Sequence, residues 1–246
     1  TQLTPRLHLK YSPDEHTTFR ASAGRGFRVA NPLAEYYGNL VSARAVVFKE
    51  ELRPEVSWNY GVSMTREFHI GDMHSSLIID YYRTDFQNQL VADMETSYSS
   101  AKNVPGSILF YNLDGKAFAN SFQAELNVIP APRLEVKLAY RLFDVKQSLL
   151  NQDGASVLMQ KMMTSRDRVL FNIGYALPYD KWKFDLTVQW NGKKRMPFIG
   201  DQQDIQVHAL LSNSVMAPSF YNVNAQITRT FVKWDVYLGG ENLTNF

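Results

Sequence analysis

Hydrophobic and polar residues alternate between Lys181 and Asn191, where the chain reads KWKFDLTVQWN. Because successive side chains of a β-strand point to opposite faces of a sheet, this segment forms one apolar face and one polar face. The apolar face carries Trp182 near one end and Trp190 near the other, with aliphatic residues between them. Indole rings favour the two membrane–water boundaries, so the pattern is typical of a strand that crosses a membrane.

The same alternation recurs along the whole chain. It predicts about ten strands joined as five hairpins, each near the roughly 9–11 residues that a tilted membrane strand requires. Short turns connect the strands of a hairpin, whereas long segments separate the hairpins, at residues 27–54, 88–115, 147–165 and 192–217. A soluble β-sandwich also alternates, but it predicts shorter strands and no systematic difference between loops. The pattern therefore favours an all-β fold, an antiparallel transmembrane β-barrel with its long loops at one end.

The alternation also assigns side chains to the lipid and to the barrel interior. Many charges fall on the interior face, and burying them unpaired would cost several kcal/mol each. The interior must therefore be wide and hydrated, or filled by a polar plug domain, and both require many strands. We expect a lipid-facing set of Trp58, Ile79, Tyr81, Phe171, Phe184, Leu186 and Val188, and a lumen-facing set of Arg20, Arg141, Arg168, Lys183, Asp185 and Gln189.

Composition narrows the function without identifying it. No apolar run approaches the ~20 residues of a membrane helix. The net charge of +2 gives no electrostatic reason to expect a nucleic-acid partner. The absence of cysteine excludes disulfides and cysteine metal sites. No nucleophile motif such as Gly-x-Ser-x-Gly occurs, so we predict no catalytic residue and no cofactor.

The five histidines do not follow the spacings of a zinc site. His69, Asp72 and His74 bracket one short turn and could meet a metal ion. A solvated turn explains the same residues, and we favour it. The sequence therefore predicts no metal site.

Two polar groups fall in the last long segment. Residues 193–195, Lys-Lys-Arg, follow a membrane strand directly. They either pair with lipopolysaccharide phosphates or form a solvated loop base, and the sequence does not separate these interpretations. Farther along, Asp201, Asp204 and His208 could contact an external ligand.

Three motifs, in order along the chain, resemble those of TonB-dependent outer-membrane receptors. Residues 23–37, AGRGFRVANPLAEYY, are similar to the family signature GxGFRxPxxxELY. Residues 52–62, LRPEVSWNYGV, are similar to the element LxPExSxxYExG, and residues 239–246, GGENLTNF, to the element xxNLFNxxY. Together they span nearly the whole chain, which makes the resemblance specific.

The resemblance implies a 22-stranded barrel occluded by an N-terminal plug. Residues 1–246 would form the distal part of that single barrel domain, with the plug domain absent from this chain. The family imports scarce, large ligands such as iron–siderophore complexes, cobalamin, haem or glycans. The implied location is the bacterial outer membrane, and the implied partners are outer-membrane lipid, lipopolysaccharide, the imported ligand, and TonB through the absent plug segment. The long loops and upper lumen would form part of the ligand vestibule, including Tyr36, Tyr37, Asp201, Asp204 and His208.

Two other functions fit a barrel of this kind. A passive, porin-like channel needs no plug, so the sequence upstream of Thr1 would separate it from a receptor. An outer-membrane hydrolase needs a catalytic group at the barrel rim, and the sequence suggests none. We therefore expect a transport receptor that is not an enzyme.

Overall fold

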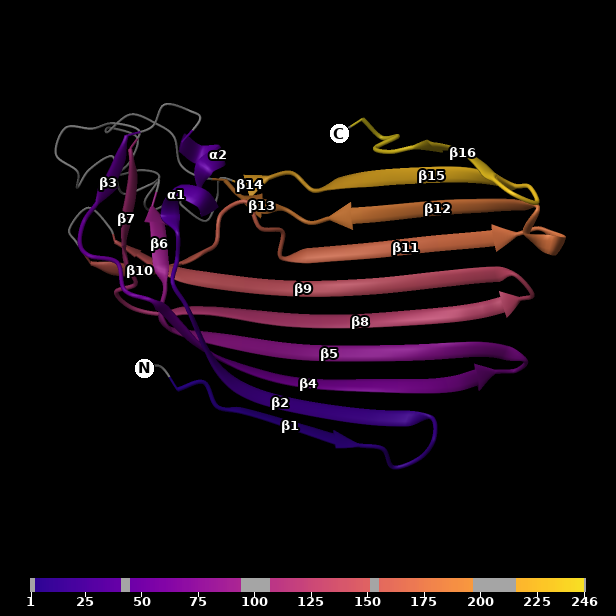
Figure 1. Ribbon diagram of the computed structural model, residues 1–246, viewed down its shortest axis with the longest axis horizontal. Coiled ribbons are helices and arrows are strands. Elements are labelled where there is room, and N and C mark those ends of the chain that lie inside the picture. The colour runs from indigo at the N-terminus through magenta and orange to yellow at the C-terminus, as the bar shows by residue number, and fades with distance from the viewer. Residues whose placement is uncertain (1–2, 41–44, 94–106, 151–154, 197–215, 246) are drawn as a thin grey trace.

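The computed structural model describes residues 3–40, 45–93, 107–150, 155–196 and 216–245. Its main feature is a broad, curved antiparallel sheet (Figure 1), in which neighbouring strands follow one another in chain order. One further strand, β10 (Ser156–Gln160), pairs with the loop end of β9. The main path comprises β1 (Arg6–Tyr11), β2 (Thr17–Arg28), β4 (Glu55–Ile70), β5 (Met73–Asn88), β8 (Ala117–Ala131), β9 (Leu134–Leu150), β11 (Asp167–Ala176), β12 (Trp182–Asn191), β15 (Phe220–Thr230) and β16 (Asp235–Gly240).

The connections alternate between short and long, as predicted. Residues 12–16, 71–72, 132–133, 177–181 and 231–234 form the short turns, and Figure 1 shows them together at one end of the sheet. The longer connections all return at the opposite end, which we call the loop end. The predicted asymmetry of the two ends is therefore confirmed.

Four central strands are longer than the sequence pattern predicted. Strands β4 and β5 have 16 residues each, β8 has 15 and β9 has 17. Their extra residues project at the loop end, where the outward face becomes polar: Arg83 and Asp85 pair at 2.6 Å, and Lys146 and Asp144 at 3.9 Å. These polar pairs interrupt the apolar–polar alternation of a lipid-facing segment. The alternation in the sequence therefore stops before the strands end.

Strand register sorts the side chains onto two faces. Leu138, Phe171, Val188 and Val223 are consecutive cross-strand neighbours, so they form one apolar row. On the other face, Arg141 lies opposite Arg168. Paired residues of adjacent strands project from the same side of a sheet. The register thus confirms the predicted alternation, while the contact of one face with lipid stays a prediction.

The two edges of the sheet are β1 and β16. Among the residues that the structure describes, these two strands do not pair with each other. The helices of the same residues are short, and none has the length and apolarity needed to span a membrane.

The long connections build a second, smaller layer at the loop end (Figure 1). Its sheet joins β3 (Val46–Phe48) in parallel to β7 (Ile108–Asn112), which pairs antiparallel with β6 (Leu90–Asp93). Val91, Ile108 and Phe110 are fully buried here, whereas the main sheet leaves most of its apolar face exposed. The remaining short elements are α1 (Pro32–Glu35), α2 (Tyr37–Leu40), the 3-10 turn η1 (Pro178–Asp180), and the paired strands β13 (Lys194–Arg195) and β14 (Met216–Ala217).

The two faces of β12 should respond differently to a charge. Lysine at Leu186, on the apolar face at the centre of β12, should lower the free energy of unfolding by about 2–4 kcal/mol, because an ammonium would enter hydrocarbon. Lysine at Gln189 should cost less than about 1 kcal/mol, since it removes only the hydrogen bond of 2.9 Å to Asn191. Refolding of each full-length receptor variant into lipid vesicles over a range of urea concentrations measures both free energies of unfolding. Equal losses of stability in the two variants would contradict the assignment of faces.

Candidate ligand vestibule at the loop end

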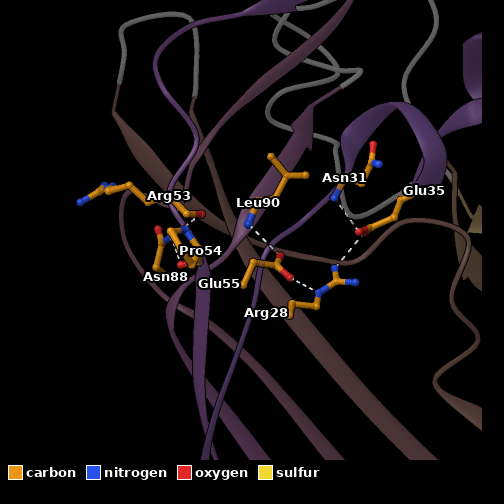
Figure 2. Close-up of polar contacts among 8 residues, drawn as sticks. All are labelled: Arg28, Asn31, Glu35, Arg53, Pro54, Glu55, Asn88 and Leu90. Carbon is orange, nitrogen blue, oxygen red and sulfur yellow. Dashed lines mark hydrogen bonds and ion pairs between the residues drawn. The ribbon is translucent and has the colours of Figure 1, made fainter. Parts of the chain in front are cut away.

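An ion-pair cluster ties the first long connection to the rim of the main sheet (Figure 2). Arg28, the last residue of β2, lies opposite Glu55, the first residue of β4, and its Nε donates to the Glu55 carboxylate. The same guanidinium donates from Nη2 to Glu35 at 2.9 Å. Glu55 also accepts the backbone N–H of Leu90 at 2.9 Å. Because Glu55 is almost buried and holds three chain segments, it fixes the rim where they meet.

Asn31 organises the segment that supplies Glu35. Its side chain accepts the backbone N–H of Ala34 at 3.2 Å, which caps α1, and its own N–H donates to Glu35 at 3.0 Å. Pro32 follows at the first helical position, where its missing N–H is harmless. The first family-like motif therefore forms a capped turn that aims Glu35 at Arg28 (Figure 2).

Two asparagines hold the second family-like motif in place. The Asn88 side chain donates to the carbonyls of Arg53, at 3.3 Å, and Pro54, at 2.9 Å (Figure 2). Asn112 accepts the Arg53 backbone N–H at 2.8 Å and donates to the Glu51 carbonyl at 2.8 Å. Both motifs thus act in the folding of the loop end, and they pack beside each other there.

A cavity of about 140 Å³ opens between this cluster and the ends of β9 and β10. Small-molecule sites typically measure roughly 300–1,000 Å³, so the cavity can receive one group of a large ligand rather than a whole one. It is lined by Arg28, Tyr36, Glu55, Gln89, Leu90, Ala92, Gln147, Leu149, Met159, Gln160, Lys161, Met162 and Arg195.

The cavity lining carries more positive than negative charge. Arg28, Lys161 and Arg195 are cations, and Glu55 is the one carboxylate among the lining residues. Arg195 is only 2% exposed, and its Nε donates to the Gln160 carbonyl at 2.6 Å. Such a lining suits an anionic group that also accepts hydrogen bonds.

Tyr36 supplies a neutral phenol to the same cavity. Its ring meets the buried Phe110 ring edge-on, with centroids 5.4 Å apart. Burial raises the pKa of Tyr36 above its usual value, and the nearby charge of Glu35 adds to this. The hydroxyl therefore stays protonated at neutral pH and can donate a hydrogen bond to a ligand.

The two tyrosines expected in the vestibule have different environments. Tyr36 lines the cavity, whereas Tyr37 begins α2, is 69% exposed and is not among the lining residues. The loop residues Asp201, Asp204 and His208 lie outside the described residues. Their roles, and that of Tyr36 in ligand binding, stay predictions.

All five predicted lumen-facing charges lie on the face opposite Leu186, but they are spread over four strands. Arg141 and Arg168 are direct cross-strand neighbours, and like charges in that position repel. Within the described part of the chain, the Arg168 Nε is buried and has no hydrogen-bond partner. Lys183 instead pairs with Asp180 at 3.7 Å. Arg20 lies on β2 and Asp185 on β12, so the charges do not form one site.

Two open interpretations from the sequence can be reconsidered. Lys193 is exposed, whereas Arg195 is buried in β13 and Lys194 lies over the Phe220 ring at 4.8 Å. Contact of these residues with lipopolysaccharide stays a prediction. His69 and His74 are cross-strand neighbours with ring centroids 5.3 Å apart. Among the described residues, however, no three His, Asp or Glu side chains come together as a metal site.

Most of the cavity lining has no signal in the sequence. Arg28, Tyr36 and Glu55 stand inside the two family-like motifs, and of these three only Tyr36 was expected in the vestibule. Met159, Lys161 and Met162 come from a connection without a pattern. They reach the cavity because β10 folds back on β9, a contact that no local periodicity indicates.

Several solved structures have a similar fold. The chain is similar to the ferripyoverdine receptor of the Pseudomonas aeruginosa outer membrane bound to ferripyoverdine, with 16% identity and a TM-score of 0.60 over 99% of this chain and 29% of that one. The siderophore receptor PiuA from Acinetobacter baumannii matches with 16% identity and a TM-score of 0.61 over 98% and 31%. The FrpB iron transporter from Neisseria meningitidis matches with 12% identity and a TM-score of 0.62 over 100% and 34%.

The chain thus spans about a third of the length of these proteins. At such low identity the likeness shows the fold alone. No curated protein sequence matches the chain. The model of the family described as "TonB dependent receptor-like, beta-barrel" matches residues 1–243. The chain therefore belongs to the TonB-dependent receptor β-barrel family, whose proteins lie in the outer membrane of Gram-negative bacteria.

Proposed function

We propose that this chain is the distal part of the barrel of a receptor that imports a scarce, large ligand with energy from TonB. The observation that carries the proposal is the folded layer at the loop end, which encloses a cation-lined cavity beside the polar face of the sheet. A passive channel needs an open mouth and has no use for such a layer. A receptor needs a mouth whose shape fits its ligand, because it must hold the ligand before transport.

Among iron–siderophore complexes, cobalamin, haem and glycans, we favour an iron–siderophore complex. Arg28, Lys161 and Arg195 give the cavity a net positive lining, which suits an anionic chelate. A neutral glycan would accept hydrogen bonds from these groups but would gain no charge–charge attraction. The solved structures with a similar fold include the ferripyoverdine receptor and the siderophore receptor PiuA, which supports the same class.

The polar face of the sheet suits contact with a plug domain. The adjacent guanidinium groups of Arg141 and Arg168 repel each other, so a carboxylate between them would stabilise both. We propose that a plug supplies such groups and that TonB acts on the barrel through it. The apolar face would contact outer-membrane lipid and lipopolysaccharide. No catalytic role is proposed.

Uptake measurements test this function. The full-length receptor, expressed in a strain that lacks its own siderophore receptors, should accumulate iron-55 bound to at least one member of a panel of catecholate and hydroxamate siderophores. Accumulation should stop when TonB is deleted or a protonophore is added. Entry of small sugars without TonB, and no uptake of any chelate, would favour the porin-like alternative.

Ligand affinity should depend on the cavity cations. Exchanging Lys161 for glutamine removes one lining charge and should raise the Kd for the transported ferric chelate by about three- to tenfold. Lys116→Gln is the matched control, because Lys116 is an exposed loop-end lysine outside the cavity lining. Fluorescence quenching titrations with the purified receptors give both values, and equal effects would contradict a role for this cavity.

The loop end should face the outside of the cell. The chain has no cysteine, so single cysteines can report which end is accessible. A membrane-impermeant maleimide should label Tyr37→Cys on intact cells and should label Val232→Cys, at the fully exposed tip of the last turn, only after the outer membrane is broken. The receptor without either substitution gives the background. Labelling of Val232→Cys on intact cells would reverse the orientation.

A further inference from the structure

Arg229 stands on the apolar face of the sheet, at the end with the short turns. In the strand register it lies between Trp182 of β12 and Val236 of β16. Its guanidinium carbon is 4.9 Å from the centroid of the Trp182 ring and 5.3 Å from that of Phe231. Phe231 in turn stacks on Trp234, with centroids 4.0 Å apart. The guanidinium is therefore held between aromatic rings at a fixed height on the sheet.

This arginine has no anionic partner within the part of the chain that the structure describes. Among the described residues, neither an ion pair nor a hydrogen bond engages its guanidinium group, whereas Arg28 and Arg83 both bind carboxylates. The acidic side chains at this end of β12 and β16 are otherwise occupied or turned away. Asp180 pairs with Lys183 at 3.7 Å, and Asp235 belongs to the opposite face because it pairs with Thr230. The N–H groups of Arg229 are thus available to an external acceptor.

Arg229 lies where the apolar rows of the sheet end and turns with aromatic and basic side chains begin. The next row toward the middle of the sheet consists of Phe184, Ile227 and Leu238, which are all exposed and apolar. In the other direction the turns carry the exposed rings of Phe231 and Trp234 together with the lysines Lys181 and Lys233. Tryptophan rings favour the headgroup level of a bilayer. A membrane around the apolar rows would therefore bring its phosphate groups to the height of Arg229.

We infer that Arg229, framed by Trp182 and Phe231, binds the phosphodiester of a phospholipid in the leaflet that faces the periplasm. A guanidinium offers a planar pair of N–H donors that matches two phosphate oxygens, while its faces remain against the rings. The flanking lysines strengthen the positive potential at the same level. The choice of leaflet rests on the proposed function, because it requires the short turns to lie in the periplasm.

Native mass spectrometry of the full-length receptor tests the site. Delipidated receptor is titrated with dioleoylphosphatidylethanolamine, and with dioleoylglycerol as the lipid without a phosphate. Arg229→Gln should raise the Kd of the most tightly bound phosphatidylethanolamine molecule by about tenfold. Arg229→Lys should raise it by less, because an ammonium keeps the positive charge but lacks the planar pair of N–H donors. Neither variant should change dioleoylglycerol binding.

Arg66→Gln is the matched control. Arg66 lies on the same face near the short turns, opposite Thr17 and Leu77. Its charge is close to the Asp14 carboxylate, and within the described residues no aromatic ring lies over its guanidinium group. This variant should bind phosphatidylethanolamine as the unmodified receptor does, and heat modifiability on gels should show that all variants are folded. Unchanged binding in Arg229→Gln, or an equal loss in Arg66→Gln, would overturn the site. Failure of the proposed function would instead appear in the uptake and labelling measurements.

Discussion

Backbone N–H and C=O groups that enter hydrocarbon must find hydrogen-bond partners within the protein, because lipid offers none. The antiparallel ladder from β1 to β16 meets this requirement for its interior strands and determines where everything else lies. Once the backbone is paired as a sheet, successive side chains alternate between its two faces. Leu138, Phe171 and Val188 share one face, while Arg141 and Arg168 share the other. The sheet therefore has no buried core of its own.

The buried core lies instead at the loop end. Val91, Ile108 and Phe110 are inaccessible to solvent in the small sheet of β3, β6 and β7. Glu55 joins this layer to the barrel strands, because one carboxylate accepts from Arg28 of β2 and from the Leu90 backbone of β6. The cavity is formed at this junction, so ligand contacts and loop folding share the same residues. Changes in the motif residues should therefore be interpreted as effects on folding first.

The strand pattern could be predicted because lipid and water select side chains locally. The segment KWKFDLTVQWN corresponds to β12, Trp182–Asn191, with its two faces as expected. The loop layer could not be predicted in this way. Its parallel pairing of Val46 with Ile108 joins segments far apart in the chain, and the segments carry no alternation that marks them as strands. Tyr36 and Tyr37 looked equivalent in the sequence, but the chain turns between α1 and α2 and only Tyr36 reaches the cavity.

The central claim is that one face of this sheet contacts lipid and the other does not. A scan of single spin labels along β12, from Trp182 to Asn191, in the full-length receptor in lipid bilayers tests it most directly. Collision with oxygen, which concentrates in hydrocarbon, should alternate with a period of two, be high at the even-numbered positions and reach its maximum near Leu186. Oxygen collision that is uniform along the strand, or highest at the odd-numbered positions, would contradict the account.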